Sequence, residues 1–344
     1  MYHFDAVVVA MNYVRRIAGD AAQSSQSGKW KDFMVVTSNT PAGNQWPLLT
    51  AKAFAEKFPL FIKAALFGLW FMSALVIVKI VRSVMAEPRV YGQDSHAYWL
   101  AAQGDLVYSR PAGTLDAYLY SPVFLTLIKP LTWLPWPVFL AAWTALLLAI
   151  VLWLVWPLPG KWAVPLTVCC LPEVLVNNIF LLLALAAVVG LRWPAAWAFP
   201  ILTKVTMGVG LLWFAARGEW WSLIKSIGAT SLIVAVAYAV DPPSWQAWVH
   251  FLLSNRDGTK DGLVLFVLRC LGAVVLVVIG ARLNWAWLIA PAMLLASPVL
   301  VSIVPAALLA AIPRLAVTNR PGSPPNHFLR PEDDMPMSRS RLRA

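Results

Sequence analysis

The sequence has few charged residues and few cysteines. Only 12% of its 344 residues are charged, whereas a soluble domain carries about 25%. Too little polar surface is therefore available to coat a water-facing globule, which excludes a soluble enzyme, and a chain that is 60% hydrophobic is not disordered. Cys169, Cys170 and Cys270 all lie inside apolar runs. They make neither a disulfide framework nor a zinc site, so a disulfide-stapled secreted module is excluded too.

The residues that are abundant are those of a membrane protein. Mean hydropathy is +0.69, and the chain contains 19 Trp and 26 Pro. Trp favours bilayer interfaces, and Pro is tolerated in membrane helices whose freed backbone groups find other partners. The net charge of +11 comes largely from basic residues between apolar runs and in the C-terminal tail. This pattern predicts membrane lipids as partners and no nucleic acid.

Three regions differ in composition. Residues 1–57 are polar, and lysines follow them into the first apolar run, so we expect a partly flexible cytoplasmic N-terminal segment. Residues 58–313 form the predicted polytopic membrane domain. Residues 314–344 are rich in Arg and Pro and are predicted to be a disordered, basic cytoplasmic tail.

The apolar runs predict an all-α integral membrane protein with about ten spanning or re-entrant helices. A bilayer core of about 30 Å needs about 20 helical residues. Runs of suitable length predict continuous spans over 58–84, 138–155, 194–216, 223–240 and 263–280. The longer runs 162–191 and 285–312 are interrupted by polar residues or proline, and each predicts two short helices. Residues 244–253 predict an interfacial helix in a second outer loop.

The longest polar interval between spans covers residues 86–119. With a cytoplasmic N-terminus, this loop faces outward. From Asp94 onward its composition favours a helix lying at the membrane surface, with Asp94 and Tyr98 on one face. Asp94 could accept a proton from an acceptor hydroxyl, or it could simply cap this helix.

The order of several motifs resembles glycosyltransferase family 87, in the GT-C superfamily of integral membrane enzymes. The residues that carry the resemblance are Asp94, Tyr98-Trp99-Leu100-Ala101-Ala102, Leu106-Val107-Tyr108, Tyr118-Leu119-Tyr120-Ser121-Pro122-Val123-Phe124, Pro130-Leu131-Thr132-Trp133-Leu134-Pro135 and Ala142-Trp143. Weaker matches are Asn177-Asn178-Ile179, Lys204 and Ser297-Pro298. The resemblance covers about residues 70–310 and is most specific over 90–145. The chain departs from the family pattern in having a single proline at Pro122 and Val205 after Lys204.

The resemblance implies a GT-C-like fold and transfer of a sugar from a polyprenyl-phosphate donor to an acceptor hydroxyl. Transfer would occur with inversion on the extracytoplasmic side of a bacterial-type plasma membrane. The acceptor would be a glycan or glycolipid, and mannosyl and arabinofuranosyl are the first guesses for the sugar. Asp94 is the expected base, with Asp105 and Asp116 as fallback choices. Since the sequence has no Asp-x-Asp or His-rich metal pattern, we expect no cofactor and no required metal.

Cations are expected at the donor phosphate, because negative charge develops there in the transition state. Lys204 is the first candidate: at the middle of a predicted span it should face a polar cavity or an anion, or be deprotonated. The alternatives are a structural pairing, for example with Glu173, and a misplaced span. Arg256, Lys260 and Arg269, in or beside the second outer loop, are the alternatives. For the sugar or prenyl chain, the candidates are His96, Tyr98, Tyr118 and Tyr120, although the tyrosines could equally be interface anchors and His96 merely exposed.

The alternative function is a non-catalytic transporter or lipid-binding scaffold with the same fold. A transporter predicts polar residues spread along the spans on both sides of the membrane midplane. An enzyme predicts that Asp94 and a cation converge in one outward cavity.

Overall fold

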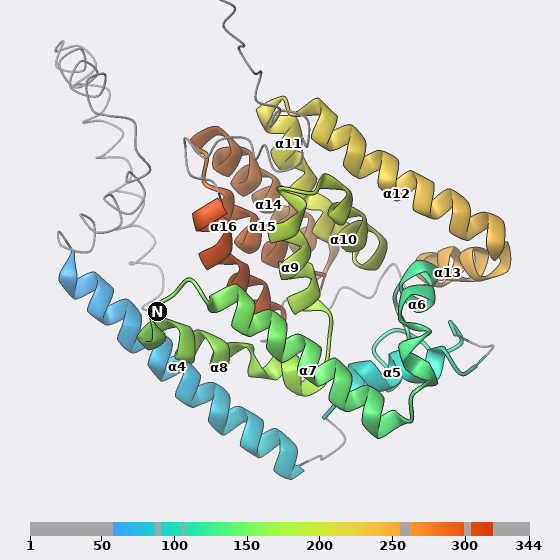
Figure 1. The fold of residues 1–344 in the computed structure, drawn as a ribbon, viewed down its shortest axis with the longest axis horizontal. Helices are drawn as coiled ribbons and strands as arrows, with labels where there is room; N and C mark the ends of the chain where they lie inside the picture. The colour runs from blue at the N-terminus through green and yellow to red at the C-terminus, as the bar shows by residue number, and fades with distance from the viewer. Residues whose placement is uncertain (1–57, 87–90, 105–106, 255–261, 299–303, 319–344) are drawn as a thin grey trace, which may run out of the picture. The chain divides into compact units, whose positions relative to one another are not determined.

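The computed structural model describes residues 58–86, 91–104, 107–254, 262–298 and 304–318. Within these residues every element of regular structure is a helix (Figure 1), as predicted. The expected N-terminal segment 1–57, residues 319–344 of the expected tail, Asp105, Arg256 and Lys260 lie outside the described residues.

Four of the described helices are long and apolar enough to cross a membrane. They are α4 (Pro59–Ala86), α7 (Trp136–Val155), α12 (Trp220–Val240) and α14 (Leu263–Leu283). They confirm the helices predicted over 58–84, 138–155, 223–240 and 263–280, each with the length and composition of a membrane span. In α4 and α7 proline occurs only in the first turn, where its missing N–H leaves no bond unmade.

Large apolar side chains cover the outer faces of these helices. Phe67 of α4 is 74% exposed, Leu232 of α12 is 65% exposed and Val264 of α14 is 75% exposed. In water such surface is unfavourable by about 25 cal/mol per Å², whereas lipid solvates it. These faces suit the hydrocarbon core of a bilayer. The length and composition of the four helices therefore indicate a membrane protein.

The interrupted run 162–191 forms two short helices, as predicted. They are α8 (Gly160–Val176) and α9 (Phe180–Gly190). The break falls at Asn177 and Asn178, while Pro172 is accommodated inside α8. The run 285–312 is also divided, into η5 (Ala286–Leu288), α15 (Ile289–Leu295), η6 (Val304–Ala311) and α16 (Ile312–Thr318). α16 continues beyond residue 313, where the tail was expected to begin.

The prediction of one continuous span over 194–216 is wrong. This run contains η3 (Pro194–Trp197), α10 (Ala198–Thr203), η4 (Val205–Leu211) and α11 (Leu212–Arg217). The backbone leaves helical geometry at Lys204, with φ −140° and ψ 89°. Two features explain the break. Val205, Thr206 and the glycines that follow are weak helix formers, and the ring of Trp197 occupies the space beside Gly210 where a side chain would otherwise stand.

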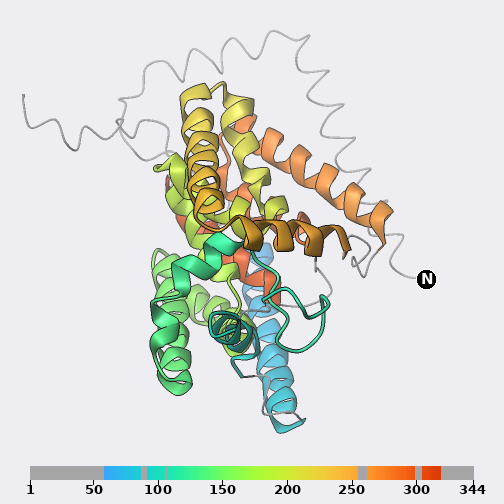
Figure 2. The ribbon, with the colours of Figure 1, turned by 90° about the vertical axis from the view of Figure 1, so that its right-hand side faces the viewer.

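Four short helices lie in or beside the two loops that were predicted to face outward. α5 (Gln93–Ala101) confirms the helix expected from Asp94, and α6 (Pro122–Ile128) and η2 (Leu131–Trp133) follow it. α13 (Pro242–Ser254) covers the expected interfacial helix and turns sharply away from the end of α12 (Figures 1 and 2). Trp245 and Trp248 of α13 are buried against α10, so α13 covers the segment that leads to Lys204.

Contacts between the helices explain how the candidate site is assembled. α4 packs along α8, α7 packs on both α8 and α9, and α5 packs on α7 and α8. α10 packs against α9 and α6. The α8–α9 break, α5 and the α10–η4 break are therefore brought together, although they are far apart in the sequence.

Candidate functional site

Gly92 fixes the start of α5. Its φ is 76°, a conformation that favours glycine, and its N–H donates to the carbonyl of Leu175 in α8 at 2.8 Å. A Cβ at this position would lie 2.6 Å from Cδ1 of Leu140 in α7. The close approach places Asp94 in the first turn of α5, where it makes no capping bond. The simpler interpretation of Asp94 as a helix cap is therefore wrong.

The break between α8 and α9 is held against α7. Asn177 has φ 59°, which asparagine tolerates better than most residues. Its backbone carbonyl accepts from Trp143 Nε1, and its Oδ1 accepts from Thr144 Oγ1, both at 3.1 Å. Trp143 and Thr144 both belong to α7. This arrangement directs the next residue, Asn178, toward α5.

Asn178 holds the Asp94 carboxylate. Its Nδ2 donates to Oδ2 of Asp94. Its Oδ1 accepts from the backbone N–H of Ile179 at 2.7 Å and from Tyr120 Oη at 3.4 Å. Because two donors engage Oδ1, the amide is oriented with its NH₂ group toward Asp94.

The environment of Asp94 increases its basicity. Burial raises the pKa of the Asp94 carboxyl above its ordinary value of 3.8, while the hydrogen bond from Asn178 and the charge of Lys204 oppose that rise in pKa. A carboxylate with a raised pKa is, in its ionised form, a better proton acceptor than an ordinary one. Asp94 keeps part of its surface exposed.

Lys204 lies beside this carboxylate. Its Nζ is 3.8 Å from the ring centroid of Phe180 and 5.7 Å from that of Tyr120, so two aromatic faces surround the cation. Its Nζ forms no hydrogen bond with a described residue and no ion pair within 4.0 Å. Its charge is nevertheless close enough to interact with Asp94 and with Glu173.

Glu173 is a second carboxylate in the same region and is fully buried. Its Oε1 accepts from the backbone N–H of Leu181 in the first turn of α9 at 3.2 Å, and its Oε2 has no hydrogen-bond partner among the described residues. A carboxylate at a helix N-terminus is stabilised by the free N–H groups there. Glu173 therefore ties α8 to α9 and lies near Lys204, without forming an ion pair with it within 4.0 Å.

The three candidate tyrosines are buried. Tyr98 and Tyr120 are joined through their hydroxyl groups at 3.2 Å, and Tyr98 shares a face of α5 with Asp94 as the spacing predicts. Tyr118 Oη donates to the carbonyl of Ser121 at 3.1 Å, which places it in the aromatic core rather than at a surface. Of the three, Tyr120 contacts both Asn178 and Lys204.

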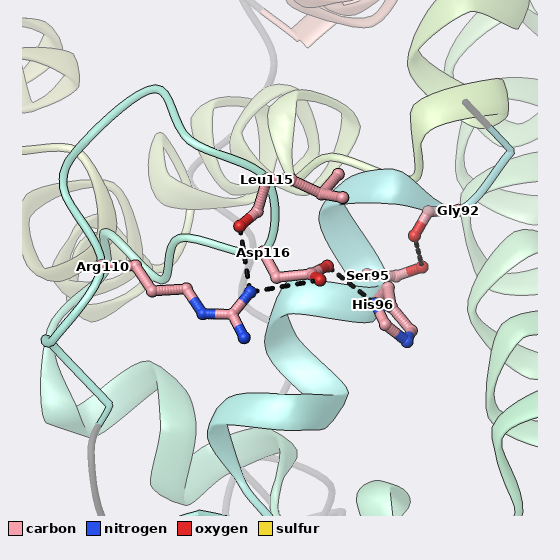
Figure 3. Close-up of polar contacts among 6 residues, drawn as sticks. All are labelled: Gly92, Ser95, His96, Arg110, Leu115 and Asp116. Atoms are coloured by element: carbon pink, nitrogen blue, oxygen red, sulfur yellow. Dashed lines mark hydrogen bonds and ion pairs between the residues drawn. The ribbon is translucent and has the colours of Figure 1, made fainter. Parts of the chain in front are cut away.

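His96 lies on the other side of α5 from Asp94. Two residues of helix put their side chains about 160° apart. Nδ1 of His96 is 2.7 Å from Oδ1 of Asp116, and NH1 of Arg110 is 3.3 Å from Oδ2 of the same carboxylate (Figure 3). His96 therefore pairs with Asp116, one of the fallback bases, and does not assist Asp94.

Two hollows lie near the group formed by His96, Asp116 and Arg110. The smaller, about 310 Å³, is lined by Tyr91, Gln93, His96, Leu115, Asp116 and Trp136. The larger, about 690 Å³, lies between residues 107–111 and α13 and includes Arg110. Neither is lined by Asp94 or Lys204.

Arg269 has a structural position. It is buried in α14, its NH1 donates to the carbonyl of Ser297 at 3.1 Å, and its guanidinium lies over Phe266. It therefore links α14 to the end of the α15 segment. Of the two expected cations that the structure describes, Lys204 lies near Asp94 and Arg269 does not take part in this cluster.

The structure adds Asn178, Glu173 and Phe180 to the site. Asn178 and Glu173 were visible in the sequence as polar residues interrupting a long apolar run, but their contacts were not. Comparisons with protein-family models, curated proteins and solved structures found no match for this chain.

Proposed function

We propose that this protein is a membrane glycosyltransferase that uses a polyprenyl-phosphate sugar as donor. The observation that carries the proposal is the convergence of Asp94 and Lys204 with Asn178 and Tyr120 in one polar cluster. These residues come from four separate parts of the sequence. A carboxylate and an ammonium group near each other in an otherwise apolar protein suit a reaction in which a proton is removed and a phosphate departs.

The proposed reaction assigns one role to each group. The acceptor oxygen forms a bond to the anomeric carbon while the bond from that carbon to the phosphate oxygen breaks. The bonding electrons leave with the lipid phosphate, and the proton of the acceptor hydroxyl passes to Asp94. Attack from the side opposite the leaving phosphate inverts the anomeric configuration. Asn178 holds the carboxylate in place throughout.

Lys204 is the proposed phosphate ligand. An ammonium group has three donors, and none is engaged by the residues that the structure describes. Aromatic faces attract a cation but accept no ordinary hydrogen bond, so Phe180 and Tyr120 position Nζ without satisfying it. A phosphate oxygen would supply both the charge and the acceptor that are missing.

The wider proposal follows the resemblance to family 87. It comprises a GT-C-like fold of about ten spanning or re-entrant helices, cytoplasmic termini, an extracytoplasmic site, and a glycan or glycolipid acceptor. The break at Lys204 supports re-entrant geometry, since irregular backbone at membrane depth is tolerated where it lines a cavity or is buried in protein. Mannosyl and arabinofuranosyl remain the proposed sugars.

Reconstituted protein tests the proposal. The purified chain in lipid nanodiscs is incubated with a panel of polyprenyl-phosphate sugars and glycan acceptors, and transferred sugar is measured. We expect turnover with at least one donor and a loss of at least about a hundredfold in Asp94→Asn, because general base catalysis contributes about 10²–10⁴ in rate. Asp241→Asn is the matched control, since Asp241 lies at the start of α13 and contacts the backbone of Ser244.

Two outcomes would contradict the proposal. Full turnover in Asp94→Asn would remove Asp94 as the base. Binding of lipid-linked sugars with no transfer from any member of the panel would favour the non-catalytic scaffold, and movement of such a lipid across the bilayer of sealed vesicles would favour a transporter.

A further inference from the structure

The smaller hollow has features of a ligand site that the proposed reaction does not use. Its volume of about 310 Å³ falls at the low end of small-molecule sites, which are about 300–1,000 Å³. Gln93 and His96 reach it from α5, on the side of the helix away from Asp94. A ligand there would not share a pocket with the Asp94–Lys204 cluster.

The polar groups of this hollow are held in fixed orientations. Asp116 has φ 59°, a conformation that costs energy for most residues other than glycine and is common at functional sites. One oxygen of its carboxylate accepts a hydrogen bond from Nη1 of Arg110, and the other oxygen contacts Nδ1 of His96 (Figure 3). Asp116 occupies Nδ1 of His96, so Nε2 is the ring nitrogen left to hydrogen-bond with a ligand.

The charges of the group are balanced. Arg110 donates to the carbonyl of Leu115 at 3.1 Å as well as to Asp116, so its guanidinium is held over the loop. The positive charge of Arg110 and the negative charge of Asp116 cancel. Asp116 lines the hollow, whereas Arg110 lies outside its lining. An anion would meet the Asp116 carboxylate, and a cation would gain little from a carboxylate already paired with Arg110, so the arrangement favours a neutral ligand.

Aromatic surface forms the remaining wall. The ring of Trp136 meets the imidazole of His96 edge to face, with centroids 4.8 Å apart. Tyr91 lies across the hollow, with its hydroxyl 3.2 Å from Thr144 Oγ1 of α7. Aromatic rings provide apolar surface that packs against C–H groups, while Gln93, His96 and Asp116 can donate to or accept from hydroxyl groups.

We propose that this hollow is a binding site for a neutral sugar residue. The ring of the sugar packs on Trp136 and Tyr91, and its hydroxyl groups hydrogen-bond with Gln93, His96 and Asp116. A single sugar presents both the C–H faces and the closely spaced hydroxyl groups that this combination accommodates. The proposal requires sugar binding only and does not depend on transfer at Asp94.

Ligand-observed NMR tests the site directly. The full chain in nanodiscs of zwitterionic lipid is mixed with methyl glycosides of mannose, glucose, galactose and arabinofuranose, and saturation transfer from protein to sugar is measured against empty nanodiscs. We expect at least one glycoside to bind. His96→Phe, which keeps an aromatic ring beside Trp136 but removes both nitrogens, should weaken that binding by about tenfold, the effect of losing one hydrogen bond.

Asp116→Asn provides a second variant, because asparagine tolerates the positive φ and keeps the loop folded. It leaves Arg110 without its counter-charge. Inorganic phosphate should not displace the glycoside from the natural chain, but it should compete in this variant. His250→Ala, which alters only the larger hollow, is the control and should bind sugar normally.

The results separate this site from the proposed function. Asp94→Asn should bind the glycoside unchanged, because it lies on the opposite side of α5. No glycoside signal above empty nanodiscs, equal binding by His96→Phe, or displacement by phosphate in the natural chain would overturn the sugar site. Each result is independent of whether any sugar is transferred.

Discussion

The proposed chemistry can be tested by substituting Asp94 and the residues around it. The spacing of Asp94 and Tyr98 correctly predicted that they share a helix face. The hydrogen bond from Asn178 could not be predicted, because it depends on a left-handed turn at Asn177 and on two bonds from α7 that hold this turn. The pairing of His96 with Asp116 could not be predicted from the sequence either, since it depends on the positive φ of Asp116.

Asn178→Ala should change how transfer depends on pH. Asp94 accepts a proton only when ionised, so the rate falls as pH falls through its pKa, which burial raises above 3.8. The hydrogen bond from Asn178 opposes that rise. Its removal should therefore raise the pKa of Asp94 further, move the acid limb of the pH–rate profile to higher pH, and lower the maximal rate by about tenfold.

The matched control is Gln103→Ala, because the Gln103 amide donates to the carbonyl of Thr132 instead. Its acid limb should coincide with that of the natural chain. A limb that stays in place in Asn178→Ala, or moves to lower pH, would show that Asn178 does not tune Asp94.

At the scale of helices, length and hydropathy predicted the four long spans and the two divided runs. They failed over 194–216, since an apolar run does not reveal where close packing interrupts the helix. Trp197 lies between Gly190 of α9 and Gly210 of η4, and a Cβ at Gly210 would lie 2.0 Å from its ring. This packing belongs to the same segment as Lys204, so its loss should affect both stability and the site.

Gly210→Ala should destabilise the protein by about 1–3 kcal/mol, as expected for overpacking a close contact. Trp197 must move, and it is fully buried. Gly228→Ala is the control, because the space around Gly228 in α12 is open, and alanine favours a helix. Unfolding by heat in detergent measures the difference. Equal midpoints for the two variants would contradict the proposed packing role of Gly210.

For the whole molecule, composition and the lengths of the apolar runs predicted an all-helical membrane protein, and the exposed apolar faces of α4, α12 and α14 agree with it. Which side of the membrane the 86–119 loop faces was inferred from the distribution of lysine and arginine and stays a prediction. This orientation decides whether Asp94 can reach an extracytoplasmic acceptor.

Cysteine labelling tests the orientation. In a chain whose three native cysteines are changed to alanine, Ser109→Cys places a thiol at an exposed position of this loop. A membrane-impermeant maleimide should label it from the outside of intact cells. Labelling only after the cytoplasmic face is opened would reverse the proposed topology.

The central claim is that Lys204 holds the donor phosphate beside Asp94, and donor affinity in nanodiscs measures it most directly. Titration with a polyprenyl-phosphate sugar should give at least about tenfold weaker binding for Lys204→Met, because a hydrogen bond to a charged group contributes about 1.5–3 kcal/mol. Lys225→Met, on α12, should bind like the natural chain. Equal donor affinity in Lys204→Met and the natural chain would contradict the account.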